Sequence, residues 1–260
     1  MLPTRPVALV TGASAGIGRE LARLLAADHD LILTARREVE LNTLAAELQP
    51  AGAKCLAIPA DLADPAWPKQ LWQAIEAAGW SVDVLVNNAG FGDVGPFSDA
   101  DTAKLLRMIQ VNVAAFTELL ALSLPGMKAR GRGRILNVGS VAGFQPGPFM
   151  AVYYATKAYV NSLSQALSSE LEGTGIRVTC LCPGPTESGF ASVAGFDEKT
   201  FSVSARMTAR DVAEVGVRAM RRGRVLTIPG WRNRLMIFLQ RFTPRSIVIR
   251  TVRWMLAKRV

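Results

Sequence analysis

Acidic residues are absent from the last 46 residues of this 260-residue chain. The formal net charge is +9 and is concentrated there, because residues 206–260 hold 14 Lys and Arg against two Asp and Glu, whereas residues 1–205 hold 16 against 19. The basic character therefore belongs to the C-terminal segment and not to the main fold. Since that segment is apolar and aromatic and carries none of the usual nucleic-acid-binding modules, we expect no nucleic acid as partner.

Cysteine is also scarce, with Cys55, Cys180 and Cys182 as the three examples. An odd, scattered set inside or beside apolar runs indicates buried thiols in a reducing compartment rather than a disulfide framework. Cys180 and Cys182 lack the His or Cys partners of a zinc site, so we expect no metal.

Two kinds of long apolar segment are missing as well. The chain passes from Met1 into a short apolar run at residues 7–10, without the apolar segment and cleavage site of a signal peptide. We find no stretch with the roughly 18 uncharged apolar residues of a membrane-spanning helix. These absences predict an intracellular, cytoplasmic protein that is not integral to a membrane; the inner face of a membrane is the second location considered.

Short apolar runs alternate with longer helical patterns along most of the chain. Runs rich in Val, Ile and Leu suit strands covered on both faces, and their alternation with helices predicts a parallel sheet wound on both sides. We expect strands at 7–10, 31–34, 54–59, 82–86, 134–138, 177–182 and 224–228, and helices at 17–27, 38–49, 65–78, 101–129, 153–172 and 210–221. The prediction is one doubly wound α/β domain with seven parallel strands over residues 1–230, including a substrate loop at about 184–209, followed by a helical extension at 231–260.

A glycine-rich turn, Gly12-x-x-x-Gly16-x-Gly18, lies between the first strand and the first helix. Glycines permit a tight turn and let backbone N–H groups reach a pyrophosphate at the helix N-terminus. The spacing differs from the G-x-G-x-x-G fingerprint, and an ordinary strand-to-helix turn is the alternative. The position directly after the first strand favours a dinucleotide site.

The second strand ends at Arg36 and Arg37, where an NAD site commonly has an acidic residue. Two guanidinium groups suit the 2′-phosphate of NADP, whose charge is about −1.5 to −2. A solvated pair before the next helix is the alternative. We favour NADP(H), with Arg36 as the more direct contact and Arg19 assisting.

Tyr153 and Lys157 are four positions apart in a helical pattern, which places both side chains on one helix face. A free phenol has a pKa of about 10 and is a poor base at neutral pH, but a nearby ammonium favours the phenolate. Such a pair can exchange a proton with an alcohol or a ketone. Tyr154 is the rival, but Ala158 stands four positions after it and carries no charge, so Tyr153 is preferred.

These motifs resemble those of the short-chain dehydrogenase/reductase family over about residues 7–229. Besides the glycine turn and the Tyr-x-x-x-Lys pair, the family's order is followed by Asp61, Asn87-Asn88-Ala89-Gly90, Asn112, Ser140 and Pro183-Gly184. The Pro-Gly-Pro-Thr-Glu segment is similar to that of the 17β-hydroxysteroid-dehydrogenase-like and 3-oxoacyl reductase branches. The resemblance implies a Rossmann-type fold and a homo-oligomer, either a dimer or a tetramer.

The resemblance also implies a role for each matching residue. Tyr153 would protonate the carbonyl oxygen, Ser140 would stabilise charge on that oxygen, and Lys157 would lower the pKa of the phenol and hold the nicotinamide ribose. Asn112 would kink its helix and support a water relay to Lys157. The implied cofactor contacts are Gly12, Ser14, Gly16, Ile17, Gly18, Arg36, Arg37, Asp61, Leu62, Asn88, Ala89, Gly90, Tyr153, Lys157, Pro183, Gly184, Thr186 and Ser188. Without the family, a buried Ser or Asn commonly satisfies backbone groups, and a lone Asp after a strand commonly caps a helix.

Apolar and aromatic residues follow the C-termini of three expected strands. They occupy residues 143–150, residues 189–196, and the segment that contains Phe91 and Phe97. In this architecture such segments surround the ligand, so they predict a pocket for a lipophilic substrate. The alternative is a satellite core under long loops.

The C-terminal extension at 231–260 mixes large apolar residues with Arg and Lys at helical intervals. This pattern is typical of a helix at a membrane surface, with Trp231 and Trp254 at the headgroup level. The segment could instead cover the substrate loops or pack against another subunit. Contact with a membrane surface is the preferred interpretation.

The sequence thus predicts an NADP(H)-dependent oxidoreductase that transfers a hydride between the nicotinamide and a lipophilic ketone or secondary alcohol, of the 3-oxoacyl or steroid-like kind. One alternative is a catalytically idle NADP-binding sensor, although Ser140, Tyr153 and Lys157 are all retained. The other is a membrane-peripheral scaffold protein whose essential part is the C-terminal extension.

Overall fold

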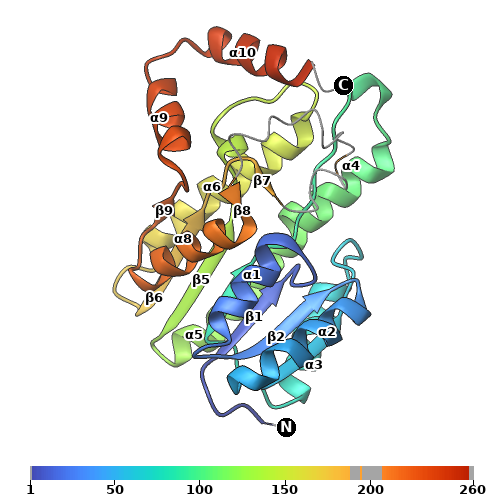
Figure 1. The fold of residues 1–260 in the computed structure, drawn as a ribbon, viewed down its shortest axis with the longest axis vertical. Helices are drawn as coiled ribbons and strands as arrows, with labels where there is room; N and C mark the ends of the chain where they lie inside the picture. The colour runs from blue at the N-terminus through green and yellow to red at the C-terminus, as the bar shows by residue number, and fades with distance from the viewer. Residues whose placement is uncertain (1, 188–193, 195–206, 258–260) are drawn as a thin grey trace.

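A parallel β-sheet forms the centre of the computed structural model, which describes residues 2–187, 194 and 207–257 (Figure 1). Its strands are β1 (Val7–Thr11), β2 (Asp30–Ala35), β3 (Cys55–Pro59), β4 (Val84–Asn87), β5 (Gly133–Val138), β6 (Ile176–Leu181) and β9 (Leu226–Thr227). They pair in the order β3-β2-β1-β4-β5-β6-β9, and all the pairs are parallel. The predicted doubly wound sheet of seven strands is confirmed.

Helices cover both faces of this sheet (Figure 1). On one face lie α1 (Gly16–Leu25), α2 (Glu38–Leu48) and α8 (Ala209–Arg221), and on the other α3 (Trp67–Ala77), α5 (Phe116–Ala129) and α6 (Ala151–Glu170). The alternation of side chains along β1 explains the two cores, because Ala8 and Val10 enter the first and Val7 and Leu9 the second. Shorter elements are η1 (Gln49–Ala51), η2 (Phe97–Asp99), η4 (Val141–Phe144), and the paired β7 (Thr186–Glu187) and β8 (Met207–Thr208).

The helix expected at 101–129 is divided by a π-helical turn. It consists of α4 (Thr102–Ile109), the π-helix η3 (Gln110–Ala115) and α5. Among the described residues this stretch, Thr102–Ala129, is the one helix whose length and composition would allow it to cross a membrane. Its residues Ala115, Phe116 and Leu119 are buried in the core beneath the sheet, as expected of a core helix.

The order of the strands creates the switch point at which doubly wound sheets bind ligands. From β1 the chain proceeds outward to β2 and β3, and then returns to place β4 on the other side of β1. The connections that leave the carboxyl ends of β1 and β4 therefore diverge, and in folds of this kind the ligand binds between them. The glycine turn and the Asn-Asn-Ala-Gly segment begin at these two ends.

The C-terminal extension forms two helices, α9 (Trp231–Gln240) and α10 (Arg245–Ala257), at the end of the molecule opposite the N-terminus (Figure 1). Val252 and Leu256 of α10 are buried in a cluster with Met150, the residue before α6. The Gln240 side chain donates a hydrogen bond to that of Gln145. The extension therefore covers the loops on the substrate side, which is one of the alternatives weighed from the sequence.

Candidate active site

The glycine turn joins β1 to α1 at the carboxyl edge of the sheet. Gly12 and Gly16 have φ of 67° and 54°, a conformation that other residues rarely adopt. Gly18 is constrained by packing instead, because a Cβ there would lie 2.3 Å from the Gly12 carbonyl oxygen. No side chain caps the N-terminus of α1. The turn is therefore a cradle with free backbone N–H groups, and its geometry fits a phosphate group.

The segment after β4 braces this turn. Asn88 donates from its side chain to the Thr11 carbonyl oxygen at 2.8 Å. The Thr11 hydroxyl in turn accepts from the backbone N–H groups of Asn88 and Ala89, both at 2.9 Å. The side chain of Asn88 thus holds two strand ends together, and the neighbouring backbone at Ala89 and Gly90 lines the crevice.

Two arginines converge on Ser14 in the glycine turn. Arg37 donates to the Ser14 hydroxyl at 3.1 Å, and Arg19 donates to the Ser14 carbonyl oxygen at 2.7 Å. The Nε of Arg19 is buried and has no hydrogen-bond partner among the described residues. Arg36, which the sequence made the more direct contact, is exposed. An unsatisfied guanidinium donor beside a phosphate cradle fits an anionic ligand that carries a further phosphate.

The remaining predicted cofactor residues follow β3 and β6 or begin α1. Asp61 is exposed, and its carboxylate accepts from the Ala63 N–H at 3.1 Å. The Thr186 hydroxyl donates to the Gly184 carbonyl oxygen at 2.9 Å. Leu62 is buried, and Ile17 packs on the core beneath α1. Pro183 accepts from the Val141 N–H through its carbonyl oxygen at 3.0 Å, whereas Ser188 lies outside the described residues.

Tyr153, Lys157 and Ser140 meet where α6 passes the end of β5. The Lys157 ammonium lies 5.9 Å from the centre of the Tyr153 ring and donates to the Val138 carbonyl oxygen at 2.8 Å. The side chains of Tyr153 and Ser140 are hydrogen-bonded. The structure thus brings together the three residues that the sequence singled out for proton transfer.

Burial governs the protonation of these groups. It raises the pKa of Tyr153 well above the ordinary phenol value, and the hydrogen bond with Ser140 opposes only part of this rise. It also lowers the pKa of Lys157 to about 8. Near neutral pH the site therefore holds a neutral phenol beside an ammonium ion. We expected from the sequence that Lys157 lowers the pKa of the phenol, whereas here burial raises the pKa of Tyr153.

Tyr154 has a different environment. Its ring lies so close to Gly147 that a Cβ on that glycine would be 2.3 Å from a ring carbon. It also makes an edge-to-face contact with Tyr153, with ring centres 6.2 Å apart. Tyr154 therefore packs against the segment 143–150, in agreement with the choice of Tyr153 as the reacting phenol.

Asn112 lies in the π-helix and is buried. Its side-chain oxygen accepts from the Phe91 N–H at 3.1 Å, and its amide donates to the Phe91 carbonyl oxygen at 2.9 Å and to the Thr156 hydroxyl at 3.1 Å. Because Thr156 precedes Lys157, Asn112 links the loop after β4 to α6. Phe91, which the sequence placed near the substrate, packs against the core instead.

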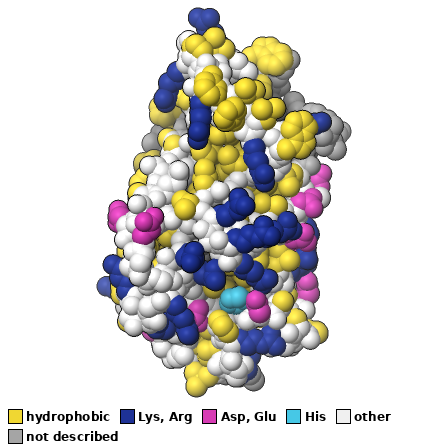
Figure 2. All heavy atoms as spheres, turned by 90° about the vertical axis from the view of Figure 1, so that its left-hand side faces the viewer, with side chains coloured by type: hydrophobic (Ala, Val, Ile, Leu, Met, Phe, Trp, Pro, Cys, Tyr) yellow, Lys and Arg dark blue, Asp and Glu magenta, His cyan; other side chains and the backbone are white. Residues whose placement is uncertain are grey.

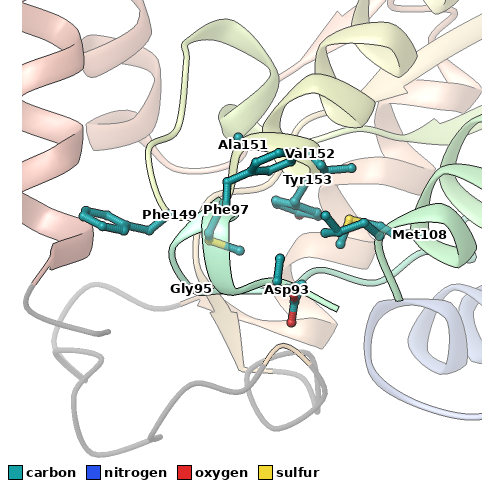
Figure 3. Close-up of a pocket in the computed structure, with 11 residues that line it drawn as sticks. Asp93, Gly95, Phe97, Met108, Phe149, Ala151, Val152 and Tyr153 are labelled. Carbon is teal, nitrogen blue, oxygen red and sulfur yellow. The ribbon is translucent and has the colours of Figure 1, made fainter. Parts of the chain in front are cut away.

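An apolar pocket opens beside Tyr153 (Figure 3). Its cavity volume is small, about 20 Å³, and it is lined by Asp93, Gly95, Phe97, Ala100, Leu105, Met108, Phe149, Met150, Ala151, Val152 and Tyr153. Phe97 and Met108 approach Tyr153, whereas the ring of Phe149 points away and packs with the cluster beneath α10 (Figure 3). Of the three predicted substrate segments, 189–196 lies outside the described residues except for the buried Ala194.

The sequence did not identify Asn161, one turn beyond Lys157 on α6. Its side chain pairs with the backbone of Ser140, donating to the carbonyl oxygen at 3.0 Å and accepting from the N–H at 3.4 Å. Gly139 and Gly143 make room for it, since a Cβ on either would lie within 2.4 Å of an Asn161 side-chain atom. The sequence features that could have identified Asn161 are the two glycines near Ser140 and the position of a polar residue four places after Lys157.

We predict that Asn161→Ala lowers the free energy of unfolding by about 2–4 kcal/mol, because two buried backbone groups of Ser140 lose their partner. Denaturant unfolding measures the change. Ser162→Ala, at the adjacent exposed position, is the control and should change stability by less than about 0.5 kcal/mol. Equal stability of the two variants would show that Asn161 does not hold this loop.

Among the described residues no group of three or more His, Cys, Asp or Glu side chains could hold a metal ion. The three cysteines are free thiols, of which Cys180 and Cys182 are buried.

Comparison with known proteins agrees with this geometry. The family model for short chain dehydrogenases matches residues 6–198. The ketoacyl reductase HetN of Nostoc sp. is 31% identical over 262 residues, covering 96% of this chain and 89% of that protein. Among solved structures, a short-chain dehydrogenase from Sphingobium yanoikuyae in complex with NADPH is 36% identical with a TM-score of 0.81, covering 87% of this chain and 88% of that one. The bulky-bulky ketone specific alcohol dehydrogenase from Comamonas testosteroni is 30% identical with a TM-score of 0.78, covering 91% and 92%. Because the family match extends over most of the sheet and the motifs stand at the strand ends where the fold binds ligands, this chain belongs to the short-chain dehydrogenase family.

Proposed function

We propose that this protein is an NADPH-dependent carbonyl reductase, reversible as an alcohol dehydrogenase, that acts on a lipophilic ketone. The observation that carries the proposal is the position of the Tyr153 side chain, hydrogen-bonded to Ser140 and 5.9 Å from the Lys157 ammonium, beside a small pocket with a mainly apolar lining. Membership of the family and the NADPH complex of the Sphingobium relative support the oxidoreductase class and the cofactor.

The cofactor would lie across the carboxyl edge of the sheet. The glycine turn would hold its pyrophosphate, and Arg19 and Arg37, with Arg36 nearby in sequence, would hold the 2′-phosphate. When bound, NADPH supplies the hydride. The backbone at Ala89 and Gly90 forms one wall of this crevice.

Side chains of the protein supply the proton that the carbonyl oxygen receives. Tyr153 donates its phenolic proton to the carbonyl oxygen as the alcohol forms, while the Ser140 hydroxyl donates a hydrogen bond to the same oxygen and stabilises its developing charge. The Lys157 ammonium then favours the phenolate that remains. Asn112 and Asn161 hold the loops on the two sides of this group through Phe91 and Ser140.

Three features favour a lipophilic substrate. Most residues that line the pocket beside Tyr153 are apolar, and its acidic member, Asp93, is paired with Lys104. Val252 and Leu256 of α10 add apolar surface over the same loops. The names of two similar proteins, a ketoacyl reductase and an alcohol dehydrogenase for bulky-bulky ketones, also favour a large ketone. A 3-oxoacyl chain or a steroid-like ketone fits these properties.

The remaining expectations belong to the same proposal. A dimer or tetramer and a cytoplasmic location are kept as parts of it. The idle-sensor alternative is less favoured, because Ser140, Tyr153 and Lys157 are present and also assembled.

Tyr153→Phe should lower kcat for ketone reduction by about 10²–10⁴-fold and leave the Kd for NADPH nearly unchanged, because the ring remains and the transferable proton is lost. Steady-state kinetics and a fluorescence titration measure the two quantities. Tyr154→Phe is the matched control and should keep most of the activity, since its ring packs on Gly147. If Tyr153→Phe were as active as Tyr154→Phe, the proton-transfer assignment would be wrong.

Lys157 should make activity decline above about pH 8, where its buried ammonium loses the proton. The kcat/KM for NADPH, which reports the free enzyme, measures this decline. Unfolding should not cause this decline in activity. The pKa of Lys157 is lower in the folded than in the unfolded chain, so the folded state binds fewer protons between about pH 8 and 10.5. The contribution of this group to the free energy of unfolding therefore rises with pH. A flat profile through pH 9, with the fold retained, would contradict the role of the charge.

The preference for NADPH over NADH tests whether Arg36 and Arg37 bind the 2′-phosphate. Arg36→Ala and Arg37→Ala, made separately, should each raise the KM for NADPH and not for NADH, and the direct contact should cost about 10–100-fold, the value of a charge-assisted hydrogen bond. The double change Ala35→Asp with Arg36→Ala should shift kcat/KM towards NADH, since a carboxylate repels the 2′-phosphate and accepts from a 2′-hydroxyl. A wild-type enzyme that already prefers NADH would refute the assignment.

A further inference from the structure

Helix α9 has two faces of different character. Its inner face includes the buried Ile237 and holds Asn233 against Gly184, where a Cβ would lie 2.5 Å from the Asn233 amide nitrogen. The opposite face carries an apolar stripe at positions 231, 235 and 238, a spacing of four and three residues that keeps one side of a helix, and Phe242 extends it in the turn after α9 ends. Trp231, Phe238 and Phe242 in this stripe are exposed by 68%, 54% and 73%.

Arginines border this stripe. Arg232 lies on one flank, stacked on Trp231 with its guanidinium carbon 5.5 Å from the ring centre, and Arg234 and Arg241 lie on the other by helical position. An apolar stripe with cations on its flanks is typical of a helix that lies in the headgroup region of a bilayer. An ordinary solvated helix would instead have polar residues at the centre of its outer face.

Helix α10 repeats the pattern. Val248, Val252 and Leu256 face the cluster beneath it, and Trp254, exposed by 63%, lies on the opposite side with Ile247. Arg250 and Arg253 are exposed next to Trp254. The upper part of the face in Figure 2 shows hydrophobic and basic side chains side by side.

The charge of this surface identifies its occupant. No Asp or Glu occurs in the sequence after Glu214, so these arginines have no carboxylate in their own segment to neutralise them. A second copy of the same basic surface would repel it, whereas anionic headgroups complement it. We propose that the outer face of α9 and α10, called here the tail surface, docks onto an anionic lipid bilayer, with Trp231, Phe238, Phe242 and Trp254 inserted at the acyl boundary.

Docking would also orient the active site. The inner face of α10 belongs to the same cluster as Met150, against which Tyr153 also packs. The tail surface is the opposite, outward face of these helices. In a docked molecule α9 and α10 would lie at the bilayer surface, and a lipophilic ketone dissolved in the bilayer could enter the pocket beside Tyr153. This second step rests on the proposed function, whereas the docking does not.

Vesicle sedimentation tests the docking with the full chain. We expect the protein to sediment with vesicles of phosphatidylglycerol and phosphatidylcholine, to bind weakly to phosphatidylcholine alone, and to be released only in part by 0.5 M salt. In the variant Arg241→Gln/Arg250→Gln/Arg253→Gln the partition coefficient for anionic vesicles should fall by on the order of 100-fold, since each cation near the surface contributes separately. Trp231→Ala/Phe238→Ala/Trp254→Ala should remove the salt-resistant part.

The matched control removes the same number of charges elsewhere. Arg218→Gln/Arg222→Gln/Arg224→Gln changes three exposed arginines at and beyond the end of α8 and should bind nearly as well as the unmodified protein. Equal losses in the two arginine variants would mean that net charge, and not the tail surface, drives binding, and would overturn the proposal. Absence of vesicle binding, with an oligomer that dissociates in the Trp/Phe variant, would overturn it in favour of a subunit interface.

Turnover separates this inference from the proposed function. Reduction of a water-soluble ketone by NADPH tests the enzyme without a membrane and should be equal in the tail variants and the unmodified protein. Vesicle binding without any ketone reduction would refute the proposed function and leave the docking in place. Ketone reduction without vesicle binding would refute the docking and leave the proposed function in place.

Discussion

Burial of the Lys157 ammonium is the constraint on which the rest of the site depends. A cation with 7% of its surface exposed must find polar partners inside the protein, and the nearest is the Val138 carbonyl oxygen at the end of β5. Around it the chain uses its polar side chains to secure backbone: Asn112 holds the loop at Phe91, and Asn161 holds Ser140. Desolvation also raises the pKa of Tyr153, which keeps the phenol protonated, the form in which it can act as a proton donor.

The carboxyl edge of the sheet carries two different sets of ligand contacts, one for the cofactor and one for the substrate. On the side of β1 and β2 the ligand would meet backbone N–H groups and arginines, a set suited to phosphates. On the side of β4 and β5 it would meet a phenol, a hydroxyl and a pocket with a mainly apolar lining, a set suited to a ketone. Because both sets are built at strand ends, the separation between cofactor and substrate follows from the strand order and not from the loops.

The C-terminal extension joins this catalytic unit to a surface of a different kind. Residues 1–205 carry nearly balanced charge, so the main domain has little electrostatic preference of its own. The extension has an excess of cations and large apolar residues on its outer side, while its inner side closes the substrate loops with Val252 and Leu256. One pair of helices thus both packs on Met150, which lines the pocket, and forms an outer surface of the molecule.

Much of this protein could be predicted from its sequence, because the signals are local. The seven strands were found within two or three residues, since buried parallel strands are short apolar runs, and the choice of Tyr153 over Tyr154 followed from the helical spacing to Lys157. Several features depended on contacts between distant segments and could not be read in this way. The π-helix at Asn112 arises where that side chain binds Phe91, the pairing of Asn161 with Ser140 joins α6 to the end of β5, and Arg37 reaches Ser14 across two strands. The sequence alone established that the C-terminal extension is basic and apolar with helical spacing. Only the tertiary structure decided which of its faces is buried, because an amphipathic pattern does not determine which surface of the fold will cover it.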